Sequence, residues 1–431
     1  MKRIFMVLAR LVLKIIIYTY YGLLSLRDSI KTKKYNNIKI QKEYNGGKVM
    51  LLALYEKKQL RNDTLELLKA ARKENVFVIA VNTLKLEQVN YPSDLVDVYI
   101  ERDNYGRDFG SYKSGMSYFI DKKMDATCER LLIINDSVFF SKLGLDEFIH
   151  SLFNSEIEVL GSTENSQHSH HLGSFCISVA GKITREDKFK AFWQDYKLSN
   201  VRPLVIKRGE FGLSKVLKSL TSSEQHFKSL YNVSFMEKKL STDHDFLADY
   251  YYYRREGESS WHNKSVTSIV EKDEVLLSYY NAYVTEKEME PRALLASSVE
   301  TNTFLRNDGS KKKEVDTLDY LTVVEFLKSN NDTSSRYALQ FRQRLIGIYL
   351  NEFTLGSQIH INCLALHHCG LPIIKLDLIF RCVCNINDII KLRDQLDESQ
   401  QEEFMTLMLS RLCGDKFLVG INRLAYQFGI L

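Results

Sequence analysis

The sequence has few prolines, and it lacks the glycine-rich loops that hold phosphates in common nucleotide-binding folds. Four prolines in 431 residues, with 45% hydrophobic and 26% charged residues, indicate a mostly folded chain without long disordered tails. No G-x-x-x-x-G-K-[ST] sequence occurs, which excludes a Walker loop. The glycines that do cluster have the wrong order for a dinucleotide fingerprint and follow the third expected strand, not the first.

Cysteine and positive charge are also too sparse or too scattered to define a class. The seven cysteines show no regular framework, which predicts a reducing compartment. His360, Cys363 and His367 recur at helical spacing, but a second ligand pair is missing, and we interpret them as the face of a buried helix instead of a zinc site. The net charge of +5 is modest and is spread along the chain, so we expect no nucleic-acid partner.

Residues 1–30 form the strongest compositional anomaly. The uninterrupted apolar run Ile15–Leu26 is short for a membrane span, and Arg3, Arg10 and Lys14 fall on one side of a helical wheel. This pattern favours an amphipathic helix at a membrane surface, with a true span or an internal packing helix as alternatives. No small-x-small cleavage site follows, which argues against a signal peptide.

Strand and helix patterns alternate after residue 47. The segments KVMLLALYE, NVFVIAVN, DVYIE and RLLIIND are typical of buried strands, and Asp63 with Glu66 suggests a capping box on the first intervening helix. The order predicts an α/β fold with a mainly parallel sheet flanked by helices over residues 48–300. RPLVIKRGEFG is expected to begin as a strand. Residues 310–431 read as a mostly helical region, with GLPIIK as a break between helices.

Two polar segments follow strands of this expected sheet. NYGRDFGSYKSG comes after the third strand and NDS ends the fourth. Ligands of parallel sheets bind at the carboxyl ends of the strands, where these two segments would meet. A nucleotide-sugar transferase requires such a pair, because the glycine-rich loop can hold base and ribose while the acidic tip holds Mg²⁺ or Mn²⁺ on the leaving diphosphate.

Four segments together resemble the rhamnan synthesis F family of bacterial polysaccharide glycosyltransferases over about residues 48–220. They are NYGRDFGSYKSG, LLIINDS, GSTENSQHSHHLGSFCISV and VIKRGEFGLSKVL, in that order. The resemblance implies a GT-A-like fold related to the inverting family 2 transferases. It implies a donor-binding role for Asn104, Gly106, Arg107, Asp108, Gly110, Lys113, Asn135 and Ser137.

The sequence departs from the related pattern at the acidic tip. Asp136 is the one carboxylate where related transferases place Asp-x-Asp, so metal binding through Asp136 would be weak. A metal-independent mechanism with Arg107 or Lys113 on the diphosphate is the alternative. Glu210 is slightly preferred over Glu164 as the catalytic base, although each could be structural.

A further donor-side residue lies in the histidine-rich loop. We expect His171 to hydrogen-bond phosphate or sugar, since adjacent histidines on a loop rarely converge on one metal ion.

The resulting hypothesis is a hexosyltransferase at the cytoplasmic face of the inner membrane, peripheral or monotopic. It would move a sugar such as rhamnose or another deoxyhexose, with inversion, from a nucleoside diphosphate donor. The acceptor would be a lipid-linked or growing cell-surface polysaccharide of the lipopolysaccharide or capsule class. The rival is a non-catalytic partner that binds nucleotide sugar or polysaccharide in an assembly complex, which the single carboxylate of NDS favours. Linkage and oligomeric state are not predicted.

Overall fold

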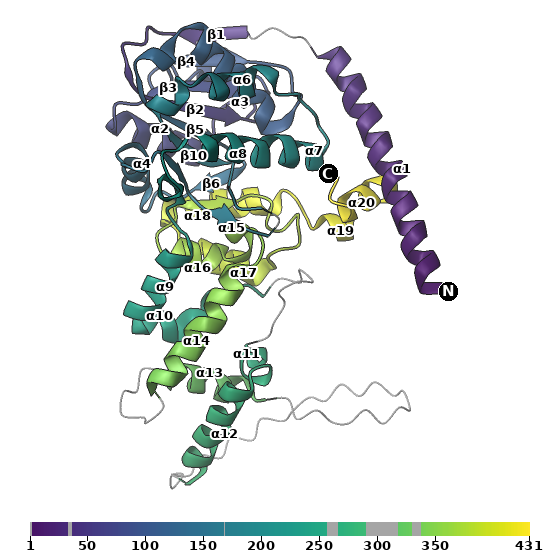
Figure 1. Ribbon diagram of the computed structural model, residues 1–431, viewed down its shortest axis with the longest axis vertical. Coiled ribbons are helices and arrows are strands. Elements are labelled where there is room, and N and C mark those ends of the chain that lie inside the picture. Colours follow the sequence, from purple (N-terminus) through teal and green to yellow (C-terminus); the bar gives the residue numbers. More distant parts are fainter. Residues whose placement is uncertain (1, 33–36, 168, 257–265, 290–317, 330–337) are drawn as a thin grey trace.

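A mixed sheet forms the upper part of the molecule in the computed structural model, which describes residues 2–32, 37–167, 169–256, 266–289, 318–329 and 338–431 (Figure 1). The strands are β1 Asn37–Gln41, β2 Gly47–Leu54, β3 Phe77–Asn82, β4 Val98–Glu101, β5 Cys128–Asn135, β6 Val138–Phe140, β7 Val159–Gly161, β8 Glu164–Asn165, β9 His171–Leu172, β10 Cys176–Ala180, β11 Phe227–Ser229 and β12 Ile373–Lys375.

Within the described residues, eight strands form one sheet in the order β1-β4-β3-β2-β5-β10-β7-β11. β1 is antiparallel to β4, and β10 is antiparallel to both of its neighbours. The remaining neighbours are parallel. The expected mainly parallel α/β sheet is therefore confirmed, with an antiparallel strand at one edge and another in its interior.

Helices cover both faces of the sheet. They are α2 Asn62–Lys73, α3 Arg107–Asp121, α4 Leu145–Phe153, α5 Gly181–Thr184, α6 Asp187–Asp195, α7 Arg202–Val205 and α8 Phe211–Leu220, with a π-helical turn Ile206–Glu210 between the last two. Side chains of β2 alternate between two cores. Leu51 packs with Phe109 and Trp193 on the face of α3 and α6, whereas Leu52 packs with Leu67 on the face of α2.

The C-terminal part is mostly helical, as the sequence predicts. It follows α9 Val233–Thr242, α10 His244–Asp249, α11 Thr267–Glu271 and α12 Glu274–Met289, and contains α13 Tyr320–Lys328, α14 Ala338–Phe353, α15 Gln358–Ile361, α16 Cys363–His368, α17 Ile386–Arg393, α18 Glu398–Leu409, α19 Gly414–Phe417 and α20 Gly420–Gln427. Figure 1 shows α15 to α18 directly below the sheet, while α9 to α14 extend away from it.

The C-terminal region is attached below the eight-stranded sheet through β12, which forms a separate two-stranded sheet with β6. This strand pairs antiparallel with β6, with Ile374 opposite Phe139. Gln400 of α18 adds two hydrogen bonds, accepting from Lys142 N at 2.7 Å and donating to Phe140 O at 3.0 Å. The segment GLPIIK thus contains a strand and is not only a break between helices, because β6 offers it an unpaired edge.

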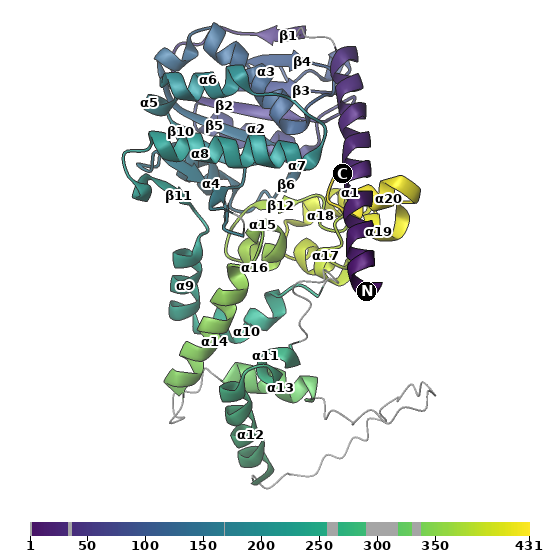
Figure 2. The same ribbon diagram turned by 45° about the vertical axis from the view of Figure 1, so that its right-hand side comes forward.

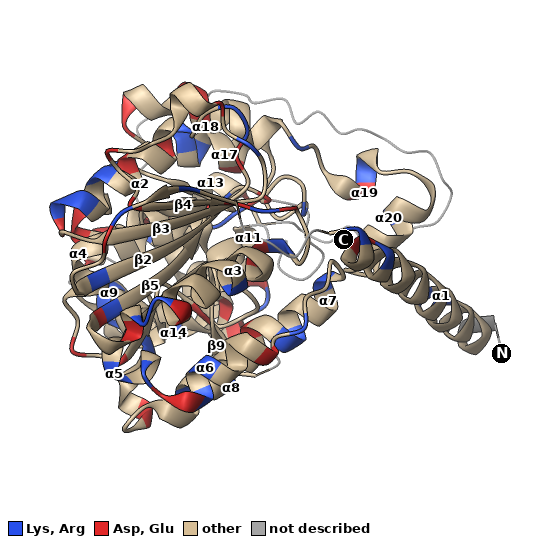
Figure 3. Cartoon of the chain, turned by 90° about the horizontal axis from the view of Figure 1, so that it is seen from above, with Lys and Arg blue, Asp and Glu red and all other residues tan. Residues whose placement is uncertain are grey.

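Helix α1 Lys2–Lys31 runs along the side of the molecule past α19 and α20 (Figure 2). It is long and apolar enough to cross a membrane, a property shared by membrane anchors and signal sequences, and little of it is buried. Figure 3 shows it projecting from the body, mostly in the tan of uncharged residues. Ile17 and Ser25 are the exceptions among its described side chains, and Ile17, 2% exposed, lies in a cluster with Val201, Ala425 and Ile430. The side chain of Arg3, which the basic stripe includes, lies outside the described residues.

Three local expectations prove wrong for physical reasons. The Asp63 carboxylate is not a helix cap, since it accepts hydrogen bonds from Arg61 and from Phe140 N. The expected strand in RPLVIKRGEFG is a helix followed by a π-helical turn. Pro203 lies in the first turn of this helix, a position that proline suits. Cys382 and Cys413 form a disulfide, although 31 residues separate them and no spacing pattern signals the pair.

Gly110 provides a test of how α3 is seated. A Cβ atom at this position would lie 2.2 Å from Tyr105 O and 2.6 Å from an Arg102 nitrogen. Gly110→Ala should therefore lower the free energy of unfolding by about 3 kcal/mol through overpacking. In the matched variant Gly347→Ala, on α14, nothing lies within 4 Å, and helix propensity should raise stability by up to about 1 kcal/mol. Urea denaturation of both variants checks this, and equal stabilities would contradict the tight seating of α3.

Candidate functional site at the carboxyl edge of the sheet

The chain order of the strands reverses between β2 and β5. From β2 the chain continues outward to β3 and β4, and it then returns to the other side of β2 to form β5. Ligands of open α/β sheets bind beyond the carboxyl ends of the strands at such a reversal. Here β2 ends at Leu54, β3 at Asn82, β4 at Glu101 and β5 at Asn135.

The glycine-rich segment after β4 is a tight turn and the start of α3. Gly106 has φ 88° and Arg107 has φ 52°, so two successive residues adopt the left-handed conformation. Such a conformation is strained for arginine and is common at functional sites. Asn200 holds the turn, since its Oδ1 accepts from Gly106 N at 2.8 Å and its main-chain O accepts from Arg107 Nε at 2.9 Å. Asp108 consequently lies in the first helical turn.

A chain of hydrogen bonds joins the two polar segments. Asn135 Nδ2 donates to Asp108 Oδ2 at 3.0 Å, and Asn135 Oδ1 accepts from Ser137 Oγ at 2.6 Å. Lys375 Nζ, from β12, donates to Ser137 Oγ at 2.9 Å. The structure thus brings Asp108, Asn135 and Ser137 together, and it adds a lysine from a distant part of the sequence.

Asp136 is buried beside a second charged group. Its Oδ2 accepts a 2.5 Å hydrogen bond from Tyr55 N, and its main-chain O accepts from Arg61 Nη1 at 3.1 Å. Burial raises the pKa of Asp136 to about 8, and the nearby positive charge of Arg61 only partly offsets this effect. Glu56, whose pKa is also raised by burial, pairs with the same guanidinium at 3.5 Å. At pH 7 the Asp136 carboxyl therefore keeps its proton unless a cation replaces it.

Glu210 and His171 face each other across a short gap. Glu210 ends the π-helical turn, and its Oε2 lies 3.9 Å from His171 Nε2. His171 Nδ1 donates to Ser169 O at 2.7 Å, which leaves Nε2 directed toward Glu210. The Glu210 carboxylate raises the pKa of Asp108 and opposes the lowering of the pKa of Lys375. Glu210 therefore belongs to the same group as the strand-end residues.

Other candidates named from the sequence are engaged elsewhere. Lys113 Nζ donates to Gln194 O and Tyr196 O, at 2.7 and 2.8 Å, which binds α3 to the end of α6. Glu164 Oε2 lies 3.1 Å from both His170 Nε2 and Ser229 Oγ. Asn104 is exposed on the turn, and Gly106 and Gly110 act through the backbone.

Sequence reasoning missed the residues from β12 and the turn after it. Burial lowers the pKa of Lys375, whereas Asp377 and Asp108 favour its charged form. Asp377 bonds Arg381 Nε at 2.6 Å and His360 Nε2 at 3.0 Å, which together hold its pKa well below the ordinary value despite burial. The IIK strand pattern was the available signal for Lys375. Its pairing with β6 could not be read from sequence spacing.

A divalent cation at Asp136 requires suitable donor atoms. Among the residues that the structure describes, no three His, Cys, Asp or Glu side chains gather as a metal site. The charge of Asp108 raises the pKa of Asp136, which puts two carboxyl groups at this edge. Mg²⁺ commonly combines one or two carboxylates with phosphate oxygens. The donors therefore fit a cation that a substrate diphosphate also holds, and they do not form a closed protein site.

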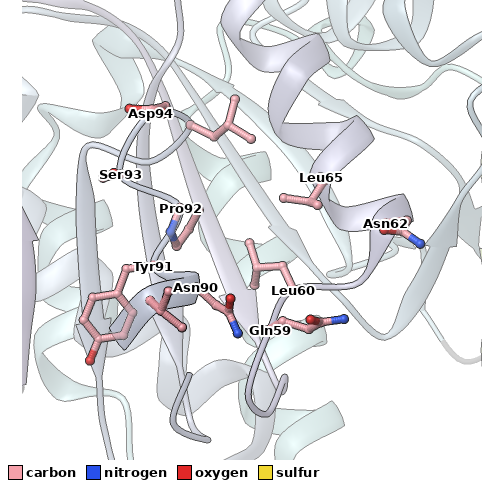
Figure 4. A pocket seen from close by; sticks show the side chains of 11 residues that line it. Gln59, Leu60, Asn62, Leu65, Asn90, Tyr91, Pro92, Ser93 and Asp94 are labelled. Carbon is pink, nitrogen blue, oxygen red and sulfur yellow. The ribbon is translucent and has the colours of Figure 1, made fainter. Parts of the chain in front are cut away.

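The charged group, which comprises Asp108, Asn135, Ser137, Lys375 and Glu210, is distinct from a surface pocket of about 370 Å³. This pocket lies between the start of α2 and the segment before β4 (Figure 4). Leu60, Leu65 and Pro92 form its apolar lining, with Asn62 and Asp94 at its margin. None of the residues predicted from the sequence lines this pocket.

Residues 76–256 match a family model described as rhamnan synthesis protein F. This segment is similar to the rhamnan synthesis F family. The match includes the turn before α3, the strand-end tip and the π-helical turn, which are the parts that carry the charged group. The family is described by a role in rhamnan synthesis.

Two curated relatives are similar over part of their length. A protein of Sinorhizobium fredii, described as uncharacterized protein y4gN, is 24% identical over 196 residues, covering 42% of this chain and 51% of that protein. Virulence protein VirA of Vibrio anguillarum is 37% identical over 146 residues, covering 33% and 46% respectively. The chain thus spans about half the length of these relatives. No solved structure matches the chain significantly.

The raised pKa of Asp136 predicts a pH-dependent stability. The folded state retains a proton that the unfolded chain loses near pH 4, so stability falls as pH rises toward about 8. Asp136→Asn has no such proton. As pH increases, the free energy of unfolding of Asp136→Asn should therefore rise relative to that of the unmodified protein, by up to about 1.4 kcal/mol per pH unit. Urea denaturation at pH 5 to 8 in EDTA measures the difference, and parallel curves would contradict the buried protonated carboxyl.

Proposed function

We propose that the chain is a glycosyltransferase of GT-A type. It moves a hexose or deoxyhexose such as rhamnose, with inversion, from a nucleoside diphosphate donor to a lipid-linked or growing polysaccharide. The observation that carries the proposal is the joining of Asp108, Asn135, Ser137 and Lys375 by hydrogen bonds at the strand-order reversal, the first three of them inside the segment similar to rhamnan synthesis F. This hydrogen-bonded group holds the carboxyl group of Asp108 and the positive charge of Lys375. Such an arrangement suits a displacement that creates negative charge on a leaving diphosphate.

Glu210 is the residue we assign as general base. Its side chain is 31% exposed, so an acceptor hydroxyl can reach it, and it adjoins the Asp108 group. Glu164 is less suited, because His170 and Ser229 already bind its carboxylate. A base within hydrogen-bond reach of the acceptor hydroxyl removes its proton as the oxygen attacks the anomeric carbon.

The leaving diphosphate needs positive charge. Lys375, held by Ser137 and near Asp108, supplies one such charge at the strand ends. A divalent cation bound by Asp136 and Asp108 would neutralise the same phosphates. The two sources are compatible, since Lys375 approaches from β12 and Asp136 from the end of β5.

Activity assays of two isosteric variants test the assignment of the base. Glu210→Gln should lower kcat by about 10²- to 10⁴-fold, the usual contribution of a general base. Glu164→Gln, the matched control, should change kcat much less, because amide groups can still bond Ser229. Transfer from a panel of nucleoside diphosphate sugars to a lipid-linked acceptor is the measurement.

The outcomes separate the proposal from its rival. Equal rates for Glu210→Gln and the unmodified protein would contradict the base. Binding of a nucleotide sugar without transfer or hydrolysis of any donor would favour a non-catalytic partner in glycan assembly.

We further propose that α1 attaches the protein to the inner membrane, with the charged group on the cytoplasmic side. Leu8, Leu11 and Ile15 are 53–57% exposed on this helix. Phe417 and Val419 add exposed apolar surface at α19 and α20, which lie beside α1 (Figure 2). An apolar face of this kind gains free energy by entering lipid.

Replacing Leu8, Leu11 and Ile15 together by Gln should release the protein from washed membranes while leaving the fold intact, since these side chains are exposed. Leu321→Gln with Leu339→Gln, both 67% exposed outside α1, is the control and should stay bound. Deletion of residues 1–26 is a poorer test, because it would uncover Val201 and remove Ser25 from Asn200. Membrane retention of the α1 variant would contradict the attachment.

A further inference from the structure

Arg202 is a cation without a visible counterion. It begins α7, where its main-chain N donates to Ile430 O at 3.2 Å. The guanidinium is half-buried, and among the described residues no hydrogen bond or ion pair satisfies it. Burial lowers the pKa of Arg202 to about 10 and the charge of Arg381 adds to this, while the more distant carboxylates of Asp377 and Glu210 oppose it. An unpaired, partly desolvated charge costs stability, so its retention needs a reason.

Arg107 lies close to Arg202 because both adjoin Asn200. Arg107 Nε donates to Asn200 O at 2.9 Å, and Arg202 is two residues further along the chain. The backbone of Arg107 is in the left-handed region, with φ 52°, while its side chain makes this bond to Asn200. No described carboxylate forms an ion pair with Arg107. Two guanidinium groups therefore share a neighbourhood, and neither forms a direct ion pair with a described carboxylate.

Two more arginines reach the same place from the C-terminal region. The guanidinium carbons of Arg381 and Arg411 lie 6.0 and 4.4 Å from the centre of the Phe380 ring. The disulfide between Cys382 and Cys413 ties the two segments that carry them. Tyr426 Oη donates to Phe380 O at 2.8 Å, and Ile430, four residues beyond Tyr426, accepts from Arg202 N, so Arg381 and Arg202 lie in one region. Burial lowers the pKa of Arg107, and the positive charges of Arg381 and Arg411 lower it further.

The nearby acids do not neutralise this group. Asp377 bonds Arg381, but it also bonds His360. Glu210 faces His171, and Asp108 bonds Asn135. Four arginines thus converge on the acids of the proposed active site with one direct carboxylate contact among them. An anion with more than one negative charge would complete the arrangement.

We propose that Arg107, Arg202, Arg381 and Arg411, here called the arginine group, form a binding site for a diphosphate. Guanidinium groups bind phosphate oxygens in bidentate pairs, and a diphosphate offers enough oxygens for several of them. The proposal deepens the transferase function and rests on it for the role of the ligand. The C-terminal region contributes to this site, because Arg381 and Arg411, two of the four arginines, lie beyond residue 380.

The position of the arginine group relates the diphosphate to the membrane helix. Val201, next to Arg202, packs on Ile17 of α1, and Ile430, which accepts from Arg202 N, belongs to the same cluster. A diphosphate here can belong to a nucleotide sugar or to a lipid-linked acceptor. The shared chemistry is the diphosphate, and binding of different probes distinguishes the two sources.

Calorimetric titration of the full chain in detergent and EDTA tests the site. The probes are inorganic pyrophosphate, thymidine diphosphate and farnesyl diphosphate. Arg202→Gln and Arg411→Gln should each weaken pyrophosphate binding about tenfold or more, equivalent to about 1.4 kcal/mol. Arg423→Gln is the matched control, because Arg423 lies on α20 in the same region and pairs with Asp415 at 3.6 Å. It should bind pyrophosphate like the unmodified protein.

The results are decisive in each direction. Weaker binding of pyrophosphate and farnesyl diphosphate, with thymidine diphosphate binding unchanged, supports the site and assigns it to the lipid. Weaker binding of pyrophosphate and thymidine diphosphate, with farnesyl diphosphate binding unchanged, supports the site and assigns it to the donor. Unchanged binding of all three probes by both variants overturns the proposal. Arg411 is exposed, so its variant tests the site even if Arg202→Gln unfolds.

The same titrations keep this proposal distinct from the enzymatic one. Pyrophosphate binding that depends on Arg202 and Arg411, without sugar transfer, would leave the site standing and remove the transferase function. Sugar transfer by the unmodified protein, with unaltered pyrophosphate binding in both variants, would support the transferase function and overturn the arginine group as a diphosphate site.

Discussion

The antiparallel pairing of β12 with β6 is the constraint on which the charged edge of the sheet depends. Three residues of β12 extend a short strand that would otherwise leave its backbone groups unpaired. The pairing places Lys375 on Ser137 and positions the following turn, with Asp377 and Arg381, over the strand ends. Without it, Asp108 would lose the lysine that favours its charged form.

Asn200 has a comparable role on the opposite side of the site. Its side-chain and main-chain groups bond Gly106 and Arg107 at the start of α3, and Ser25 and Asp28 in α1. Helix α1 is therefore joined to the strained turn that presents Asp108. Because Asn200 bonds both elements, a shift of α1 would reach this turn through a single residue.

Burial sets the electrostatics of the edge. Desolvation raises the pKa of Asp136 and Asp108 and lowers that of Lys375. Burial therefore favours the neutral form of each of these groups. Perturbed groups of opposite sign that meet in one place are typical of functional sites. A diphosphate or a cation entering this edge would shift those equilibria, because it supplies the charge that burial withholds.

The sequence by itself determined the alternating strands and helices, the apolar α1 and the meeting of the two polar segments, because these follow from local periodicity and from the rule that parallel strands share a carboxyl edge. Asp108, Asn135 and Ser137 were found in this way. The tertiary structure alone decided that Lys375 joins them and that Lys113 binds the end of α6 instead. Contacts between segments more than 200 residues apart depend on which unpaired edges and buried charges find each other, and no local pattern encodes that choice.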